Sequence, residues 1–262
     1  MPETYESHAK GIRILPGQWR PHHPFEQIAW VSPSWPCQDY IWLDFPEAVF
    51  TDAGLLFLSH ISPRFPVVFP GLPKVPWRER ENGIRFDRSL PNGVSFGGSL
   101  SRTEERVVEM RLSLHNGCER PLRNIKLQVC AYMRAVRELA DHTMDNKYVH
   151  VPDRGWVRFE EAASASEARG RYRLGWRDGP SSADWPVIAT VSNPPGRIAA
   201  MTWYGSTYSL IGNPAHPCMH ADPFFPDLGP FEGACIRGEL LFFEGTLDGF
   251  AEWFSRRGQG CG

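Results

Sequence analysis

The stretch VVEMRLSLHNG, residues 107–117, has the most regular pattern in the sequence. Apolar residues at positions 108, 110, 112 and 114 alternate with polar ones, and Asn116 and Gly117 follow. The same alternation returns from Ile125 to Tyr132. Period-two alternation is typical of strands with one buried face, and Asn-Gly favours a turn. The sequence therefore predicts a hairpin of two long antiparallel strands, with a connection wider than a tight turn.

Short apolar and aromatic segments lie on both sides of this hairpin, separated by the 24 glycines and 24 prolines of the chain. Such segments indicate strands, and the prolines are expected at edges and in loops, not in central strands. A second hairpin is predicted from Ile84 to Leu100, around Pro91, Asn92 and Gly93. Other strands are predicted at residues 27–31, 40–45, 55–59, 67–69, 187–191, 198–204 and 235–243.

The last apolar residues of the chain, Leu247, Phe250, Ala251 and Phe254, have the spacing of a short helix. Many antiparallel strands and one C-terminal helix indicate an all-β fold, namely a large antiparallel β-sandwich of jelly-roll or related type. Because 262 residues suit one β-rich unit, we expect a single β-sandwich domain over residues 1–262. Its exposed strand edges would allow a homo-oligomer to form.

Composition limits the partners of the chain. A hydrophobic share of 42% is enough to bury a core. A net charge of −2 does not attract nucleic acid or an anionic membrane, so neither is expected as a partner. Because no apolar run is long enough to cross a bilayer and residues 1–10 lack a signal-peptide core, we expect a cytoplasmic location. The six cysteines lack CxxC spacing and are expected to be free, mostly buried thiols.

Side chains that move protons or bind metals are densest in the stretch HPCMHADP, residues 216–223. Its prolines remove backbone donors, so we expect a stiff loop there and not a central strand. Loops of this kind often carry function. The residue types in this stretch suit three different chemistries.

The first chemistry is general acid/base catalysis, in which a histidine passes a proton and a carboxylate orients it. Within the stretch His220 can pair with Asp222, and His216 can pair with Glu232 a little further on. Bracing of a proline-rich loop is the structural alternative for the same groups. Distant parts of the chain are expected to supply further partners, namely Asp44, Glu47 and His60.

The second chemistry is metal binding, because His220-Ala221-Asp222 has the His-x-Asp form of a two-histidine, one-carboxylate site. His216 is the expected third ligand, and Cys218 would favour zinc or copper. A divalent metal is the one cofactor that the pattern suggests, and otherwise none is expected. The third chemistry is nucleophilic catalysis by Cys218, activated by the flanking histidines.

Aromatic and basic residues supply the other half of a sugar site, since a flat ring stacks on a pyranose and arginines bind its oxygens. Trp42, Trp77 and Trp203 lie on or beside predicted strands, and core packing is the alternative role for each. Arg78, next to Trp77, would suit an acidic sugar. His142 begins a polar loop that would close over a ligand.

Residues 107–116, followed by Pro121, Leu122 and a second long strand, resemble the central hairpin of galactose-mutarotase-like proteins. The stretch LGPFE, residues 228–232, is similar to the turn before the last strand of that family, with Phe231 in the place of a glycine. The resemblance implies a supersandwich fold and a carbohydrate ligand. The chain also resembles an uncharacterised family of bacterial β-sandwich proteins, which implies no activity.

The resemblance also shows where this chain departs from the family. The strand after the hairpin carries Cys130 and Tyr132 where a mutarotase presents a histidine to the sugar. The role of the family's catalytic glutamate would fall to Asp222, Asp227 or Glu232.

We therefore expect a carbohydrate-active enzyme that uses histidine and carboxylate acid/base chemistry on a sugar or oligosaccharide. Epimerisation, glycosidic cleavage and β-elimination all fit, so the enzyme would be an isomerase, a hydrolase or a lyase. The alternatives are a non-catalytic carbohydrate-binding protein, which needs only the tryptophans, and a metal-dependent oxygenase or isomerase. The central catalytic candidates are His220 and Asp222, followed by His60, Glu232 and Asp44.

Overall fold

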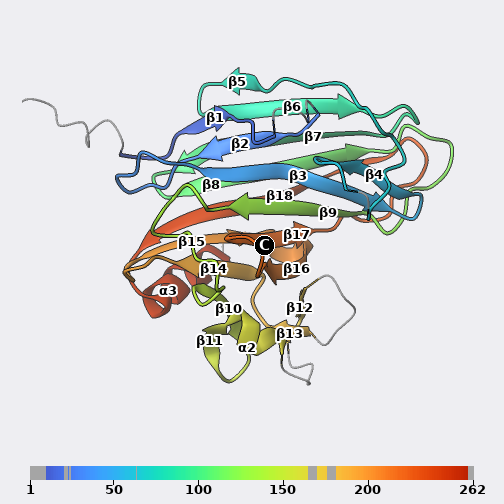
Figure 1. Ribbon diagram of the computed structural model, residues 1–262. Coiled ribbons are helices and arrows are strands. Elements are labelled where there is room, and N and C mark those ends of the chain that lie inside the picture. Colours follow the sequence, from blue (N-terminus) through green and yellow to red (C-terminus); the bar gives the residue numbers. More distant parts are fainter. Residues whose placement is uncertain are drawn as a thin grey trace, which may run out of the picture.

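The computed structural model describes residues 10–20, 23, 25–62, 64–164, 170–175 and 181–258. Within these ranges the chain forms two nine-stranded sheets that share one apolar core (Figure 1). Among the described strands, one neighbouring pair is parallel and the others are antiparallel. The structure is thus the antiparallel β-sandwich that the sequence predicts.

The strands of each sheet follow one another in a defined order. The first sheet runs β1 (Ile14–Pro16), β2 (Ile28–Val31), β3 (Ile41–Thr51), β9 (Lys126–Tyr132), β17 (Cys218–Pro223), β16 (Thr207–Gly212), β12 (Tyr172–Leu174) and β13 (Ser181–Ala183), with β4 (Gly54–Leu58) also paired to β3. The second sheet runs β11 (Gly155–Arg158), β10 (Lys147–Val151), β14 (Val187–Val191), β15 (Arg197–Thr202), β18 (Gly233–Glu244), β8 (Val107–His115), β7 (Ser95–Glu104), β6 (Gly83–Ser89) and β5 (Arg78–Arg80). The short helical elements are α2 (Phe159–Ala163), η1 (Tyr204–Ser206) and α3 (Leu247–Gly258).

The alternation in β8 explains how the two sheets pack. The apolar residues from Val108 to Leu114 point into the core, where they join Val129 of β9 and Met219 of β17. The intervening polar residues Arg111 and Ser113 face the other way. Burial of the apolar face is the main force that holds such a sandwich together.

The long hairpin predicted over residues 107–132 is wrong, although both of its strands exist. The strand β8 pairs with β7 and β18, whereas β9 pairs with β3 and β17 in the opposite sheet. Between them the chain crosses from one sheet to the other. Asn116 fixes this crossing, because its buried Nδ2 donates to the carbonyl oxygens of Arg120, Leu228 and Gly229.

Other predictions fit the structure better. The second hairpin is confirmed as β6 with β7, and the C-terminal helix is confirmed as α3. Phe250 and Phe254 of α3 pack on the outer face of the second sheet, and Arg257 ties the helix to Glu104 and Glu239. Residues 67–69 do not form the predicted strand.

The stretch 216–223 was expected to be a stiff loop, and this expectation is wrong. Its residues Cys218–Pro223 form β17, a central strand between β9 and β16. Pro217 precedes the strand and Pro223 is its last residue, so neither proline interrupts the ladder. Pro46 lies within β3, where the register shifts between Asp44 and Ala48 and a bulge accommodates it.

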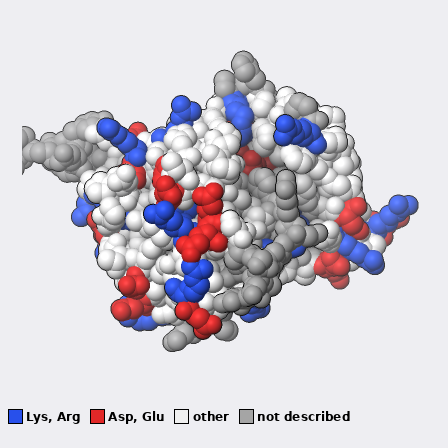
Figure 2. Space-filling view, turned by 60° about the horizontal axis from the view of Figure 1, so that its bottom comes forward, with Lys and Arg blue, Asp and Glu red and all other residues white. Residues whose placement is uncertain are grey.

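The five described cysteines are free, as expected, but only Cys130 and Cys218 are buried. The expectation of mostly buried thiols is therefore wrong. The face drawn in Figure 2 mixes basic and acidic side chains among the described residues. No described helix is both long enough and apolar enough to cross a membrane.

Candidate functional site

The outer face of the first sheet carries a group of polar and sulfur-containing side chains. These side chains are buried, although the outer face of a sheet is ordinarily exposed to solvent. Two cross-strand rows form it, since Asp44 pairs with Cys130 and Cys130 with His220, while Tyr132 pairs with Cys218 in the next row. Strand alternation sends the residues between them into the core. The register of β3, β9 and β17 therefore gathers these side chains on one surface.

The N-terminal segment that precedes β2 covers this surface. The ring of Trp19 stacks on that of Tyr132 with centroids 4.6 Å apart, and Trp42 packs against both rings. Under this cover His220 and Cys218 are each only 2% exposed. Between cover and sheet lies a cavity of about 260 Å³, lined by Trp19, Arg20, Glu47, His60, Cys130, Tyr132, Asn213, His216, Cys218 and His220.

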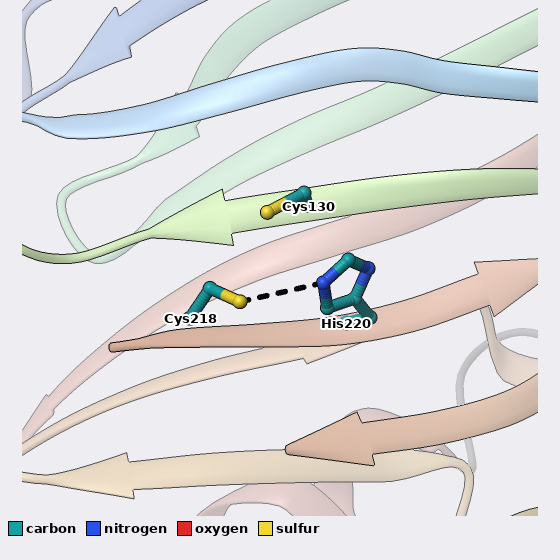
Figure 3. Close-up of side chains that lie close together, drawn as sticks. All are labelled: Cys130, Cys218 and His220. Atoms are coloured by element: carbon teal, nitrogen blue, oxygen red, sulfur yellow. Dashed lines mark hydrogen bonds between the residues drawn. The ribbon is translucent and has the colours of Figure 1, made fainter. Parts of the chain in front are cut away.

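At the sheet side of the cavity, two sulfur atoms and an imidazole face one another (Figure 3). Cys218 Sγ is 3.4 Å from His220 Nε2, and one donor atom from each of Cys130, Cys218 and His220 lies within 4.8 Å of the others. The hydrogen bond from the Cys130 thiol, aided by His220, lowers the pKa of Cys218 to about 4. The same bond and burial raise the pKa of Cys130 well above its usual value.

The other nitrogen of His220 faces two carboxylates. Its Nδ1 is 3.7 Å from Asp222 Oδ1 and 3.9 Å from Glu47 Oε2. Burial alone would lower the pKa of His220, but Cys218 and Asp222 together raise it well above the usual value. Asp222 is itself fixed, because its carboxylate accepts hydrogen bonds from the backbone amide of Val129 and from Ser209 Oγ.

A second polar group, formed by Asp44, Glu47 and His60, lies beside the first. Asp44 Oδ2 accepts a hydrogen bond from Ser59 Oγ at 2.6 Å and lies 3.4 Å from the Arg20 guanidinium. Burial and the nearby Glu47 raise the pKa of Asp44 to about 8, and burial raises that of Glu47 to about 6. His60 Nδ1 is 3.5 Å from Glu47 Oε1, and burial together with Arg20 lowers the pKa of His60 to about 4.

Two carboxylate oxygens in this group are incompletely bonded. Asp44 Oδ1 and Glu47 Oε2 are buried, and no described group donates a hydrogen bond to either. Buried acceptors normally have a donor, because leaving one without a partner costs about 1–3 kcal/mol. Of the two residues only Glu47 lines the cavity, so its Oε2 is the acceptor that a ligand hydroxyl group there would reach.

Several predicted residues meet at this cavity. His220, His216 and His60 line it, Asp44 lies beside Glu47 and His60, and Asp222 supports His220 from behind. Trp19 and Tyr132 form the aromatic wall of the cavity, and Trp42 packs against both of them. Of the expected metal ligands, His220 and Cys218 belong to a described cluster whose donor atoms are close enough to share an ion, whereas His216 and Asp222 do not.

Other predicted residues lie elsewhere. Glu232 accepts a hydrogen bond from the amide of Gly229 in the turn before β18. Trp203 is fully buried and stacks on Phe45 in the core. Trp77 donates to the backbone of Ile28, Arg78 is exposed near Asp87, and His142 is exposed in the loop before β10.

Sequence reasoning missed Trp19, Arg20 and Glu26, which form the cover of the cavity. Nothing in the polar segment around them signals this role, because it depends on how the segment folds back over the sheet. Cys130 was noticed only as a departure from a family pattern. Its outward position in an alternating strand was the available signal.

The chain matches no protein-family model, and no curated protein matches it by sequence. Solved structures do resemble it. An aldose epimerase homologue from C. elegans has a TM-score of 0.46 and 12% identity, over 91% of this chain and all of its own. A galactose mutarotase related enzyme from Lactobacillus acidophilus has a TM-score of 0.46 and 8% identity, over 90% of this chain and 98% of its own. At these values the reaction of this chain has to be argued from its own residues.

Proposed function

We propose that the chain is a carbohydrate-active enzyme that binds a sugar in the cavity and changes it by proton transfer. The observation that carries this proposal is that the rings of Trp19 and Tyr132 line one cavity with Glu47, whose Oε2 has no hydrogen-bond donor among the described residues. A sugar can contact both features, since the apolar face of its ring packs on aromatic rings and its hydroxyl groups donate hydrogen bonds to a carboxylate.

The aromatic wall would bind one face of the sugar ring. Trp19 and Tyr132 line the cavity directly, and Trp42 supports their orientation. A cavity of about 260 Å³ is smaller than the ~300–1,000 Å³ common for drug-sized ligands. The space therefore suits a single sugar unit better than an oligosaccharide.

The proton-transferring groups would be Glu47 and His60, which contact each other at the cavity wall and keep part of their surface exposed. Asp44 is almost fully buried, is bonded to Ser59 and does not line the cavity, so it would act on the sugar only through its neighbour Glu47. His220, supported by Asp222, would complete the polar side of the site. Epimerisation by proton transfer needs an acid and a base within reach of the reacting centre.

The experiment compares Glu47→Gln with Glu232→Gln, which is the same change in a turn outside the cavity. Wild type is titrated calorimetrically with neutral aldoses and uronates, and bound sugars are followed by proton NMR for epimerisation, cleavage or elimination. We expect Glu47→Gln to retain sugar binding and lose at least 100-fold in turnover, within the usual range for a general acid or base. We expect Glu232→Gln to resemble wild type.

Two outcomes would contradict the proposal in different ways. Full turnover by Glu47→Gln would remove Glu47 from the chemistry. Saturable binding with no turnover by wild type would instead support the non-catalytic carbohydrate-binding alternative.

A further inference from the structure

We propose that Cys130, Cys218 and His220 form a binding site for a transition-metal ion, and that Zn²⁺ is the ion they suit best. This inference goes beyond the proposed function and does not depend on it, because metal binding is measured without a sugar. The three residues come from adjacent strands, β9 and β17, with their donor atoms in one cluster (Figure 3).

The spacing of the donor atoms fits a tetrahedral ion. With Zn–S near 2.3 Å and Zn–N near 2.0–2.1 Å, the sulfur and nitrogen of a tetrahedral site lie about 3.6 Å apart. Cys218 Sγ and His220 Nε2 are 3.4 Å apart. All three donor atoms lie within 4.8 Å of one another, so small side-chain adjustments would bring Cys130 to the same ion.

The second nitrogen of His220 has the surroundings expected of a metal ligand. A metal-binding histidine commonly gives its other N–H to a carboxylate, which fixes the ring and its tautomer. Here Nδ1 faces Asp222 at 3.7 Å and Glu47 at 3.9 Å. Asp222 cannot easily move, since Val129 and Ser209 bond to its carboxylate.

The ligand set selects the class of metal. Two thiolates and an imidazole favour Zn²⁺ over Ca²⁺ or Mg²⁺, which prefer oxygen ligands. Three protein ligands with a cavity on the remaining side match a catalytic zinc site, where the fourth position takes water or substrate. A sugar oxygen bound next to Glu47 would be within reach of that position.

A second described cluster, Asp44, Glu47 and His60, is a weaker candidate. The guanidinium of Arg20 already lies 3.4 Å from Asp44 and 3.1 Å from Glu26. A fixed cation therefore supplies the positive charge that a metal ion would bring to this cluster.

The test uses the full chain, kept reduced, stripped of metal with a chelator and then equilibrated with Zn²⁺ or Co²⁺. Metal content is measured by mass spectrometry, and Co²⁺ is followed by its absorption, because thiolate ligands give sulfur-to-metal charge-transfer bands. We expect one ion per chain in wild type and in Cys235→Ser, whose thiol is exposed and distant in the fold. We expect Cys218→Ser and His220→Gln to weaken binding at least 100-fold.

Circular dichroism and thermal melting show whether each variant is folded. If a variant fails to fold, the charge-transfer bands of wild type still test for thiolate ligation directly. Reduced wild type that binds neither ion, or a Co²⁺ spectrum without those bands, would overturn the proposal. So would a folded Cys218→Ser protein that retains the wild-type affinity.

Discussion

Glu26 holds the backbone of Trp19 in place over the cavity. Its Oε1 accepts hydrogen bonds from the amides of Trp19, at 2.6 Å, and Arg20, at 2.7 Å, while its Oε2 lies 3.1 Å from the Arg20 guanidinium. The cavity thus depends on a carboxylate that does not line it. Glu26 therefore positions Trp19 without contacting a ligand in the cavity.

We expect Glu26→Gln to weaken sugar binding about tenfold. Hydrogen bonds to a charged group contribute about 1.5–3 kcal/mol, and about 1.4 kcal/mol corresponds to a factor of ten in affinity. Calorimetric titration of the variant with a sugar that wild type binds gives the change. Glu252→Gln on α3 is the matched control, and equal affinities in the two variants would show that Glu26 does not position the wall.

Asp222 provides a test of the metal site that leaves all three proposed ligands intact. Because its carboxylate orients His220, Asp222→Asn should weaken Zn²⁺ binding by about 10–100-fold, as loss of such a supporting group usually does. Competition with a chromophoric chelator measures the affinity. An unchanged affinity in a folded variant would mean that Asp222 has only a structural role.

Lys147 is a buried charge that the proposed chemistry does not use. Its side chain is fully buried, Nζ donates to Asn146 Oδ1, and burial lowers its pKa to about 8 despite the opposing effects of Cys218 and Asp141. In the unfolded chain a lysine titrates near pH 10.4. The unfolded state therefore holds more protons between pH 8 and 10.4, and the free energy of unfolding should rise with pH across that window.

Lys147→Met should remove this dependence. Below pH 8 the variant should be more stable than wild type by on the order of 2 kcal/mol, because the cost of burying the charge is then fully present. Above pH 10 the advantage should disappear. Urea unfolding at pH 7 and pH 10 gives both values, and a constant difference between the two proteins would contradict the assigned shift.

Asn116 fixes the crossing between the two sheets. Its Nδ2 serves three carbonyl oxygens and its Oδ1 accepts from the amide of Cys118, with no exposed surface. Asn116→Ala would leave several of these buried groups unsatisfied, so we expect a loss of about 2–4 kcal/mol in the free energy of unfolding. Asn92→Ala, in an exposed turn, is the control, and equal losses would show that the crossing is not fixed by Asn116.

The sequence predicts where the strands lie better than it predicts which strands pair with each other. Alternation in residues 107–115 correctly indicates a strand with one buried face. It says nothing about which strand lies beside it, so β8 and β9 were wrongly joined as a hairpin when they belong to opposite sheets. Only the wide connection around Asn116 hinted that the chain leaves the sheet.

The site was predictable in part. Counting chemistry-bearing side chains found the stretch 216–223, but its prolines suggested a loop. Because residues 218–223 form a strand, Cys218 and His220, which are two residues apart, lie on the same face of the sheet. The addition of Cys130 needed the strand register. Glu47 was expected as a distant partner, but its position in the site depends on a bulge beside Pro46, and a sequence pattern specifies neither the register nor the bulge.

The most direct test of the sugar cavity is saturation-transfer NMR with neutral aldoses and uronates, on wild type and Trp19→Ala. We expect at least one sugar to receive saturation from wild type, with a dependence on concentration that saturates. We expect Trp19→Ala, which loses one side of the aromatic wall, to bind that sugar at least tenfold more weakly while remaining folded. Equal binding by the two proteins would contradict the proposed site, and no binding of any of these sugars by wild type would contradict the proposed function.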